Sequence, residues 1–420
     1  MENKTYLNLQ YIVLCVFAFV LPFSTPTISY LNYTPTLLGI LLLFWLLEAD
    51  FKRKFQRIKT NHFLLPFLLC ISLYMLYILG LLYTSNLDFG KTDLFLKLPL
   101  LLFPLIIFTL RSDYFTKNRM MVLLKLFIAG NIVAIVASLI HSSILYMDVP
   151  TFYHFHYVCA SLFHHASYAS MYYCFSFTLV IYLFLTQKLK RYEKIIGGVG
   201  FVLFITETVL LDSRAGTLTF FSVILAYGVY IFLKRLINIK TILAAVFLGL
   251  VFAGAYALLP NKTNRIQSTV EELKKEPLST SNTDKNNARI LIWDASMTVS
   301  LKNLPFGTGT GDVKDELRKQ YAIDNYTIPY EENYNAHNQF LQIFATLGIL
   351  GILAFVAISI LPFWTGIKKK NILFIIFGII IYINFFVESM LEKQVGVMFF
   401  CFFFPLLYFI FQQDTENLPK

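Results

Sequence analysis

A histidine stands between two asparagines in the stretch NAHN, residues 335–338, directly before a long apolar run. Near pH 7 a neutral imidazole is the side chain best suited to take a proton from a reacting hydroxyl, so His337 is a candidate general base. The apolar run predicts a helix that starts here, with His337 in its first turn, where the helix dipole favours a neutral ring. Alternatively, the ring only satisfies a neighbouring backbone carbonyl.

Two arginines are candidates for holding an anion. Arg214 lies in the stretch SRAG between two apolar runs. Arg289 lies at the start of ARILIWDASM, where an amphipathic helix is predicted with Arg289 in its first turn and with an apolar face of Ile290, Ile292 or Trp293, Met297 and Leu301. A guanidinium group forms two parallel hydrogen bonds with phosphate oxygens, which an ammonium group cannot do. The alternatives are that Arg214 is an interfacial anchor or a partner of Asp212, and that Arg289 is a solvated loop charge.

Polar residues continue beyond His337 at steps of three and four. This spacing places them on one face of the predicted helix, which we expect to be hydrogen-bonded or to line a cavity. Asn338 and Gln342 are the candidate substrate-lining residues on that face. The full set is Asn335, Asn338, Gln339, Gln342 and Thr346.

Four histidines crowd the segment before residue 166, at positions 154, 156, 164 and 165. Histidines could hold zinc, but no Cys, Asp or Glu stands at ligand spacing beside them. We therefore expect an interfacial or substrate-facing role, with His165 as a further substrate-lining candidate and no metal site.

The stretch FGTGTGD, residues 306–312, is rich in glycine but lacks the Lys-Ser/Thr and the preceding strand of a phosphate-binding loop. We interpret it as a tight turn leading toward the predicted helix. The acidic residues Asp312, Asp315 and Glu316 that follow could ligate a divalent cation. The alternative interpretation is a helix start, where acidic side chains favour the positive end of the dipole.

The composition of the chain predicts what kind of secondary structure positions these residues. Of 420 residues 57% are hydrophobic and 14% charged, and the mean hydropathy is +0.63, which excludes an ordinary soluble domain. The sequence predicts an all-α integral membrane protein. About twelve segments are long and apolar enough to be transmembrane helices: 8–24, 34–49, 62–83, 94–110, 120–140, 166–186, 195–211, 216–233, 241–259, 338–364, 371–388 and 394–411.

Lys and Arg are retained on the cytoplasmic side of membranes, and the basic loops here fall on alternate sides of the twelve segments. With both termini in the cytoplasm, we expect residues 1–259 to hold nine helices, 260–337 to form one large periplasmic loop, and 338–420 to hold three helices and a short cytoplasmic tail. The net charge of +10 is then a topology signal, and no nucleic-acid partner is expected.

Of the five cysteines, only Cys159 falls in a predicted extracytoplasmic loop, so no disulfide framework is expected. The first apolar segment lacks the usual small-residue cleavage site after it, and we expect it to be a retained helix. Residues 270–287 are predicted to be flexible and solvated.

Several of these motifs together resemble one family. Three motifs are similar to the pattern of the O-antigen ligase and O-antigen polymerase superfamily. They are SRAG at the start of a span, R-x-x-x-W followed by NLPFGTGTGD, and HNQFLQIFATLGILG entering the next span. HHASYASMYY is similar to a family stretch that begins His-Pro, although Ala166 stands here where the family has proline.

The resemblance implies a GT-C-like, metal-independent, inverting glycosyltransferase of the bacterial inner membrane, without a cofactor and with its active site on the periplasmic face. The donor would be an undecaprenyl-pyrophosphate-linked glycan, and the acceptor a hydroxyl of a glycolipid in lipopolysaccharide biosynthesis. Arg214 and Arg289 would bind the pyrophosphate, and His337 would deprotonate the acceptor.

Within this resemblance we favour an O-antigen ligase, which transfers the glycan to a lipid A core sugar. The alternative in the same superfamily is a polysaccharide polymerase. The alternative from another class is a lipid-linked oligosaccharide flippase, although flippases tend to show internal repeats and polar residues in the middle of spans, and this sequence has no repeat of fixed period.

Overall fold

The computed structural model describes residues 2–60, 63–257 and 288–416. Within these ranges the chain forms helices and no strand. The α-helices are α1 (Glu2–Val20), α2 (Thr34–Leu47), α3 (Phe51–Thr60), α4 (Leu64–Gly80), α5 (Leu87–Lys97), α6 (Pro99–Ile107), α7 (Lys117–Asp148), α8 (Ala166–Thr186), α9 (Arg191–Leu210), α10 (Arg214–Leu233), α11 (Ile239–Ala257), α13 (Ala288–Lys302), α14 (Val313–Ile323), α15 (Thr327–Glu331), α16 (Gln339–Lys368), α17 (Ile372–Val387) and α18 (Gln394–Glu416). Short 3₁₀ helices are η1 (Leu21–Phe23), η2 (Ser29–Leu31), η3 (Phe152–Phe155), η4 (Tyr157–Ala160) and η5 (Met390–Glu392).

The protein is a multi-pass membrane protein. Lipid cannot satisfy backbone N–H and C=O groups, so a chain this apolar crosses it as helices. Among the described residues, six helices are long and apolar enough to span a membrane, or seven if α2 and α3 are one bent span. The six lie in α1, α7, α8, α10, α16 and α18.

Each of the twelve expected spans overlaps at least one α-helix of the described structure, but the number of spans, twelve, is not confirmed. The 17 residues of α4 and the 16 of α17 are short for a span. The expected span at 94–110 is divided between α5 and α6, because Pro99 starts a new helix where the preceding one ends. The predicted flexible segment 270–287 lies outside the described residues.

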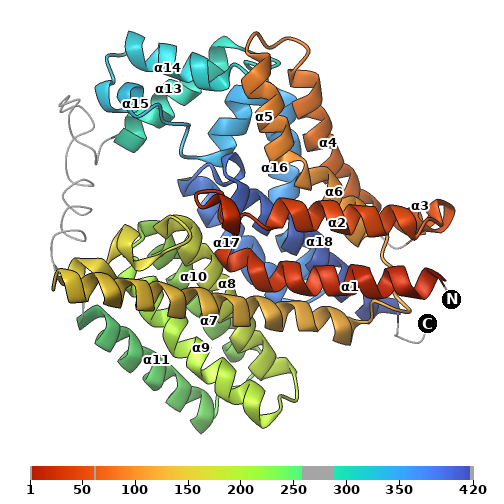
Figure 1. Cartoon of the computed structure of the whole chain (residues 1–420), viewed down its shortest axis with the longest axis vertical. Helices are drawn as coiled ribbons and strands as arrows, with labels where there is room; N and C mark the ends of the chain where they lie inside the picture. The colour runs from red at the N-terminus through yellow and green to blue at the C-terminus, as the bar shows by residue number, and fades with distance from the viewer. Residues whose placement is uncertain (1, 61–62, 258–287, 417–420) are drawn as a thin grey trace.

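The core is centred on α18, whose apolar window is 89% buried. A helix that is apolar all round must be covered on all sides. Phe403 of α18 packs against Phe127 of α7 and Phe175 of α8, with ring centroids 4.7 and 4.8 Å apart. In Figure 1, α1, α2 and α7 lie side by side across the middle of the molecule, α9 and α11 lie below them, and α13 to α15 gather with α5 at the upper end.

A backbone joint connects α16 to the glycine-rich segment. Gly348 interrupts α16 with a φ of 63°, and a Cβ there would lie 2.0 Å from the carbonyl oxygen of Pro305. The N–H groups of Thr308 and Gly309 donate to the carbonyls of Ala345 and Thr346, at 2.8 and 3.0 Å. The expected turn is therefore present, and its backbone bonds directly to the broken helix.

The acidic residues after the glycines bond this segment to the loop between α4 and α5. Asp312 accepts from the backbone N–H groups of Ser85 and Asn86, each at 2.7 Å, and Asp315 accepts from the Asn86 side chain at 2.9 Å. Asp315 and Glu316 lie in the first turn of α14, which confirms the helix-start interpretation.

The amphipathic helix expected after residue 288 is present as α13, but of its predicted apolar face only Ile292 is fully buried. Ile290, Met297 and Leu301 are 61%, 42% and 56% exposed. The buried face consists mainly of small residues, because these let α13 pack closely on α14 and α16. That face is Ala288, Ile292, Ala295, Ser296, Val299 and Ser300.

Candidate active site

A cavity of about 770 Å³ opens where several helix ends meet. The starts of α8, α14 and α16, the end of α17 and one face of α5 contribute to it. Its volume lies in the range of small-ligand sites, and its lining mixes aromatic and charged side chains. The polar residues that line it include Asp93, His165, His337, Gln342, Glu388, Glu392 and Lys393.

His337 pairs with a carboxylate at the edge of this cavity. Its Nδ1 lies 3.0 Å from Oε1 of Glu388, the residue that directly follows α17. The ring also meets Tyr334 edge to face, with centroids 5.0 Å apart. Because Nδ1 is buried beside the Glu388 carboxylate, the other ring nitrogen, Nε2, is the one that can accept a proton from a bound hydroxyl.

His337 does not lie in the first turn of a helix, contrary to expectation. Asn338 is the N-cap of α16, so His337 precedes the helix, and its φ is 43°. The side chain of Asn335 accepts from the His337 N–H at 3.0 Å, and Ser389 accepts from the Asn338 N–H at 3.2 Å. The expected placement of His337 within the helix dipole was therefore wrong, and the charged group beside the ring is Glu388.

The expected polar face of α16 is buried and hydrogen-bonded. Gln339 accepts from the N–H of Leu391 at 2.6 Å, and Gln342 accepts from the N–H of Ala336 at 3.0 Å. Gln342 also lines the cavity, as expected. The Asn338 side chain caps the helix by accepting from two backbone N–H groups, and among the described residues it does not line the cavity.

The charge of Arg289 acts on this site. Burial opposes ionisation of Glu388, but the hydrogen bond and charge of His337, the charge of Arg289 and the Ser389 N–H hold the pKa of its carboxyl below the ordinary value. Trp293, one turn after Arg289, packs against Phe386 of α17 at 5.4 Å, which fixes the start of α13 beside the end of α17.

His165 lies at the N-cap of α8 and lines the same cavity. Burial lowers the pKa of its ring, and the charges of His337, Arg289 and Lys393 lower it further, against the opposing effect of Glu388. His165 is thus a neutral side chain near pH 7 that can hydrogen-bond a substrate.

Arg214 is the exposed first residue of α10 and, in the described structure, does not line the cavity. Thr219 of α10 accepts a hydrogen bond from Asn384 of α17 at 3.2 Å. At about 1.5 Å per residue, Arg214 lies about 7.5 Å before that contact and Glu388 about 6 Å beyond it along the antiparallel α17. Arg214 therefore reaches the same level of the bundle as the His337–Glu388 pair.

A buried ion cluster supports the opposite wall. Lys97, which is fully buried, pairs with Asp93 one turn earlier and with Oε1 of Glu392 at 3.1 Å. Its ammonium group also lies 4.7 Å from the ring centre of Tyr77. The cluster joins α4, α5 and η5, while Asp93 and Glu392 still reach the cavity.

The other loop histidines do not converge. His154 contacts the carbonyl of Val149 at 3.1 Å, and Nε2 of His156 lies 3.4 Å from Asp212. Burial lowers the pKa of His164 to about 4. Across the described ranges, no group of three or more His, Cys, Asp or Glu is arranged to hold a metal ion.

The helix that carries Arg214 and the helix start beside His337 also lie within one stretch of chain that matches a known family. Residues 199–356 match the O-Antigen ligase family model. This confirms the resemblance that the motifs indicate. The matched segment contains Arg214, Arg289, His337, Asn338 and Gln342.

A curated protein of Haemophilus influenzae, named only "Uncharacterized protein", is 26% identical to this chain over 206 residues. The alignment covers 47% of this chain and 49% of that protein. The chain thus spans about half the length of the curated relative that it matches, and the relative's name assigns no activity.

Several cavity residues lie outside the O-antigen ligase segment, and the sequence had not singled them out for the site. Glu388, Glu392 and Lys393 follow α17, and Asp93 belongs to α5. Glu388 is the last residue of the predicted span 371–388. Its position at the end of an apolar span, on the same side as His337, was the available signal.

Proposed function

We propose that this protein is an O-antigen ligase-like glycosyltransferase. It transfers a glycan from undecaprenyl pyrophosphate to a hydroxyl of a glycolipid acceptor, a lipid A core sugar. The family match supports an enzyme of the ligase and polymerase type, and the cavity supplies the side chains for this reaction.

The observation that carries the proposal is the His337–Glu388 pair at the cavity wall. The acceptor oxygen attacks the anomeric carbon, its proton passes to Nε2 of His337, and the bond from that carbon to the pyrophosphate oxygen breaks. Glu388, ionised near pH 7, stabilises the imidazolium that forms. A single displacement of this kind inverts the anomeric configuration.

The leaving group is a pyrophosphate, which departs without a general acid but must have its charge neutralised. Arg289 lies near the base, and Arg214 lies at the same level of the bundle. With both guanidinium groups on the phosphate oxygens, the reaction requires no metal ion. His165 and Gln342 are the proposed substrate-lining residues, and Asn338 supports them by capping α16.

The site belongs, in this proposal, on the periplasmic face of the bacterial inner membrane. The twelve apolar segments would all cross the membrane in a GT-C-like arrangement. The segment from 260 to 337 would be the periplasmic loop, and the basic loops, including residues 50–59 and 187–194, would face the cytoplasm.

Turnover by purified protein in detergent tests the class of function. With a lipid-linked glycan donor and a glycolipid acceptor, we expect the acceptor to become glycosylated although there is no membrane to cross. A flippase gives no covalent product in this assay. The same mixture without glycolipid acceptor separates the two enzymes, because a polymerase extends the lipid-linked donor itself whereas a ligase does not.

Arginine replacements test the pyrophosphate site. Arg289→Lys and Arg214→Lys keep the charge but lose one of two parallel hydrogen bonds, so each is expected to reduce transfer about ten- to a hundredfold. Lys302→Gln, which removes a cation from the far end of α13, is the matched control. An arginine whose Lys variant reacts at the native rate is only an interfacial anchor.

A further inference from the structure

The end of α2 carries a sharp bend into the short basic helix α3. The two helix axes meet at 106°, so α3 runs nearly perpendicular to the apolar α2. Ala49 and Asp50, which form the bend, both have a φ of 53°. Non-glycine residues rarely adopt this conformation, so the surrounding contacts must hold it.

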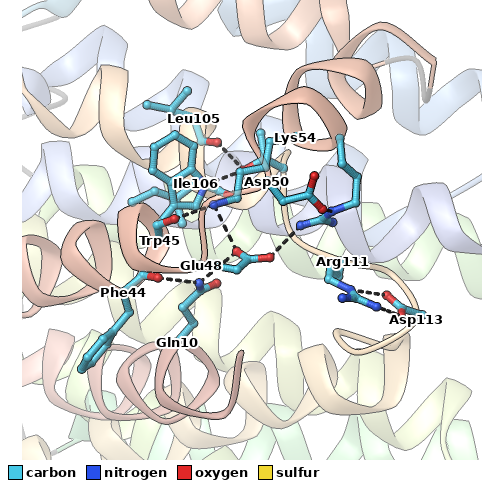
Figure 2. Close-up of polar contacts among 12 residues, drawn as sticks. Gln10, Phe44, Trp45, Glu48, Asp50, Lys54, Leu105, Ile106, Arg111 and Asp113 are labelled. Carbon is cyan, nitrogen blue, oxygen red and sulfur yellow. Dashed lines mark hydrogen bonds and ion pairs between the residues drawn. The ribbon is translucent and has the colours of Figure 1, made fainter. Parts of the chain in front are cut away.

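A buried polar network supplies those contacts. Glu48 accepts hydrogen bonds from Gln10 of α1 at 3.1 Å and from Arg53 at 2.6 Å. It also forms an ion pair with the ammonium group of Lys54 at 3.2 Å. Lys54 also donates to the carbonyl of Trp45 at 2.5 Å. Figure 2 shows Gln10 and Lys54 directed at Glu48 from different helices. This network fixes the direction of α3 relative to α1 and α2.

With α3 fixed in this way, two aromatic rings are partly exposed, although one edge of the Phe51 ring packs on Trp45 with the ring centroids 5.5 Å apart. Lys54 and Ile58 form the buried side of the helix, whereas Phe51 and Phe55 are 41% and 48% exposed. Residues four apart lie on one helix face, so the two rings form a common apolar surface at the end of a membrane span.

α3 lies at the end of α2 that is farther from the cavity. Thr34, at the start of α2, contacts Gln394, which lines the cavity, at 3.0 Å. The 14 residues of α2 separate that end from the bend by about 21 Å, most of the way through the hydrocarbon of a bilayer. α3 therefore lies along the opposite membrane surface.

The charge of α3 is strongly positive. The helix contains five Lys and Arg and no acidic residue. Three of these cations are used within the protein: Arg53 and Lys54 on Glu48, and Arg57 over the ring of Phe409 at 5.1 Å.

The other two cations, Lys52 and Lys59, are exposed and form no ion pair with any carboxylate among the described residues. At 3.6 residues per turn they lie about 100° and about 80° around the helix from Phe51, on one flank of the aromatic surface. Two ammonium groups beside an apolar pair match a lipid whose phosphate lies just above its acyl chains.

We propose that α3 is a binding site for anionic phospholipid on the membrane surface opposite the cavity. Phe51 and Phe55 enter the acyl boundary, and Lys52 and Lys59 contact the headgroup phosphate. The strained bend and the Glu48 network hold these four side chains in place before the lipid binds. This site is separate from the glycan-transfer site and does not depend on it.

The test compares lipid binding to the purified full-length protein in neutral detergent. Phosphatidylglycerol and phosphatidylcholine of matched chain length are titrated, and bound lipid is counted by native mass spectrometry. We expect phosphatidylglycerol to bind preferentially, and Lys52→Gln/Lys59→Gln to weaken that binding about tenfold or more. Lys52→Arg/Lys59→Arg should bind as the wild type does, because it keeps both charges.

The matched control removes two exposed lysines from another basic segment that is expected on the same side, as Lys188→Gln/Lys194→Gln. Lys188 follows α8, and Lys194 lies in the first turn of α9. This control should bind phosphatidylglycerol as the wild type does. Equal loss in the control, unchanged binding in Lys52→Gln/Lys59→Gln, or equal binding of phosphatidylcholine by the wild type overturns the proposal. Displacement of the lipid by millimolar inorganic phosphate also overturns it, since the site would then recognise a soluble anion.

Discussion

The two ends of the helix bundle each bury a carboxylate against a basic side chain, but they leave different groups accessible. At the α3 end, Glu48 contacts Gln10, Arg53 and Lys54, and all four side chains are occupied within the protein. At the cavity end, Glu388 contacts His337, whose side chain remains 25% exposed.

This difference distinguishes buried pairs that hold the backbone in place from pairs that can exchange a proton with a substrate. A network in which each charged group has a partner within the protein holds a backbone conformation, as the bend at Ala49 and Asp50 requires. A pair with one nitrogen facing a cavity can exchange a proton with a substrate. We therefore expect mutations at the α3 end to change stability and mutations at the cavity end to change rate.

The largest effect is expected at His337. His337→Ala should reduce transfer about a hundred- to ten-thousandfold, the usual contribution of a general base. His337→Gln should be nearly as slow, because an amide cannot take the proton. Single-turnover transfer by purified protein measures the rate, and donor binding should persist in both variants. Recovery of most activity in His337→Gln would mean that the ring only positions the acceptor.

Lys54→Met tests the closed network. It removes one cation from a buried carboxylate, and we expect a loss of about 3 kcal/mol in the free energy of unfolding, with Arg53 limiting the damage. Transfer per folded molecule should stay at the native rate, as measured on the monodisperse fraction. Adding Glu48→Gln should restore most of the stability, because the unpaired charge is gone. A slower rate in the folded fraction would contradict the separation of the two ends.

Glu388→Gln should reduce transfer about ten- to a hundredfold, because a charged hydrogen bond to the base is lost. Since the folded protein lowers the pKa of Glu388, its ionisation stabilises the fold above the ordinary glutamate value of about 4.3. That contribution disappears as the pH falls through the lowered value. The difference in melting temperature between wild type and variant should thus narrow toward pH 3. A constant difference from pH 7 to pH 3 would assign Glu388 a packing role.

The smallest effect is expected from metal removal. Activity in EDTA should equal activity without chelator, since arginines neutralise the pyrophosphate. A loss that magnesium or manganese restores would instead assign a ligand role to Asp312 and Asp315, whose carboxylates now bind the α4–α5 loop.

The sequence predicted the helices well, because an apolar run in lipid has few other conformations available. It also predicted the turn at the glycines and the buried polar face of α16, since both follow from local spacing. Pro99 and the small residues of α13 produced the main errors. A proline inside an apolar run divides it, and a face of Ala and Ser is recognised only when its partner helix is known.

The central pair of the site could not be predicted in the same way. His337 and Glu388 are separated by the whole of α16 and α17, and only the packing of those helices brings them within 3.0 Å. Local rules placed His337 inside a helix, whereas the Asn338 cap starts α16 one residue later. Pairings across the bundle follow from packing, which sequence spacing does not contain.

The joint between Thr308 and Ala345 closes a loop, because these residues are 37 positions apart in the chain. The closed segment contains α14, α15 and His337, and it supplies Lys314, Glu332 and Tyr334 to the cavity wall. The entropic free-energy cost of closing a loop rises slowly, by about 0.6 kcal/mol for each doubling of the loop length. Residues can therefore be inserted between α14 and α15 at little thermodynamic cost, so this part of the cavity wall can change in length while the ends of the loop, and His337 near one of them, keep their positions.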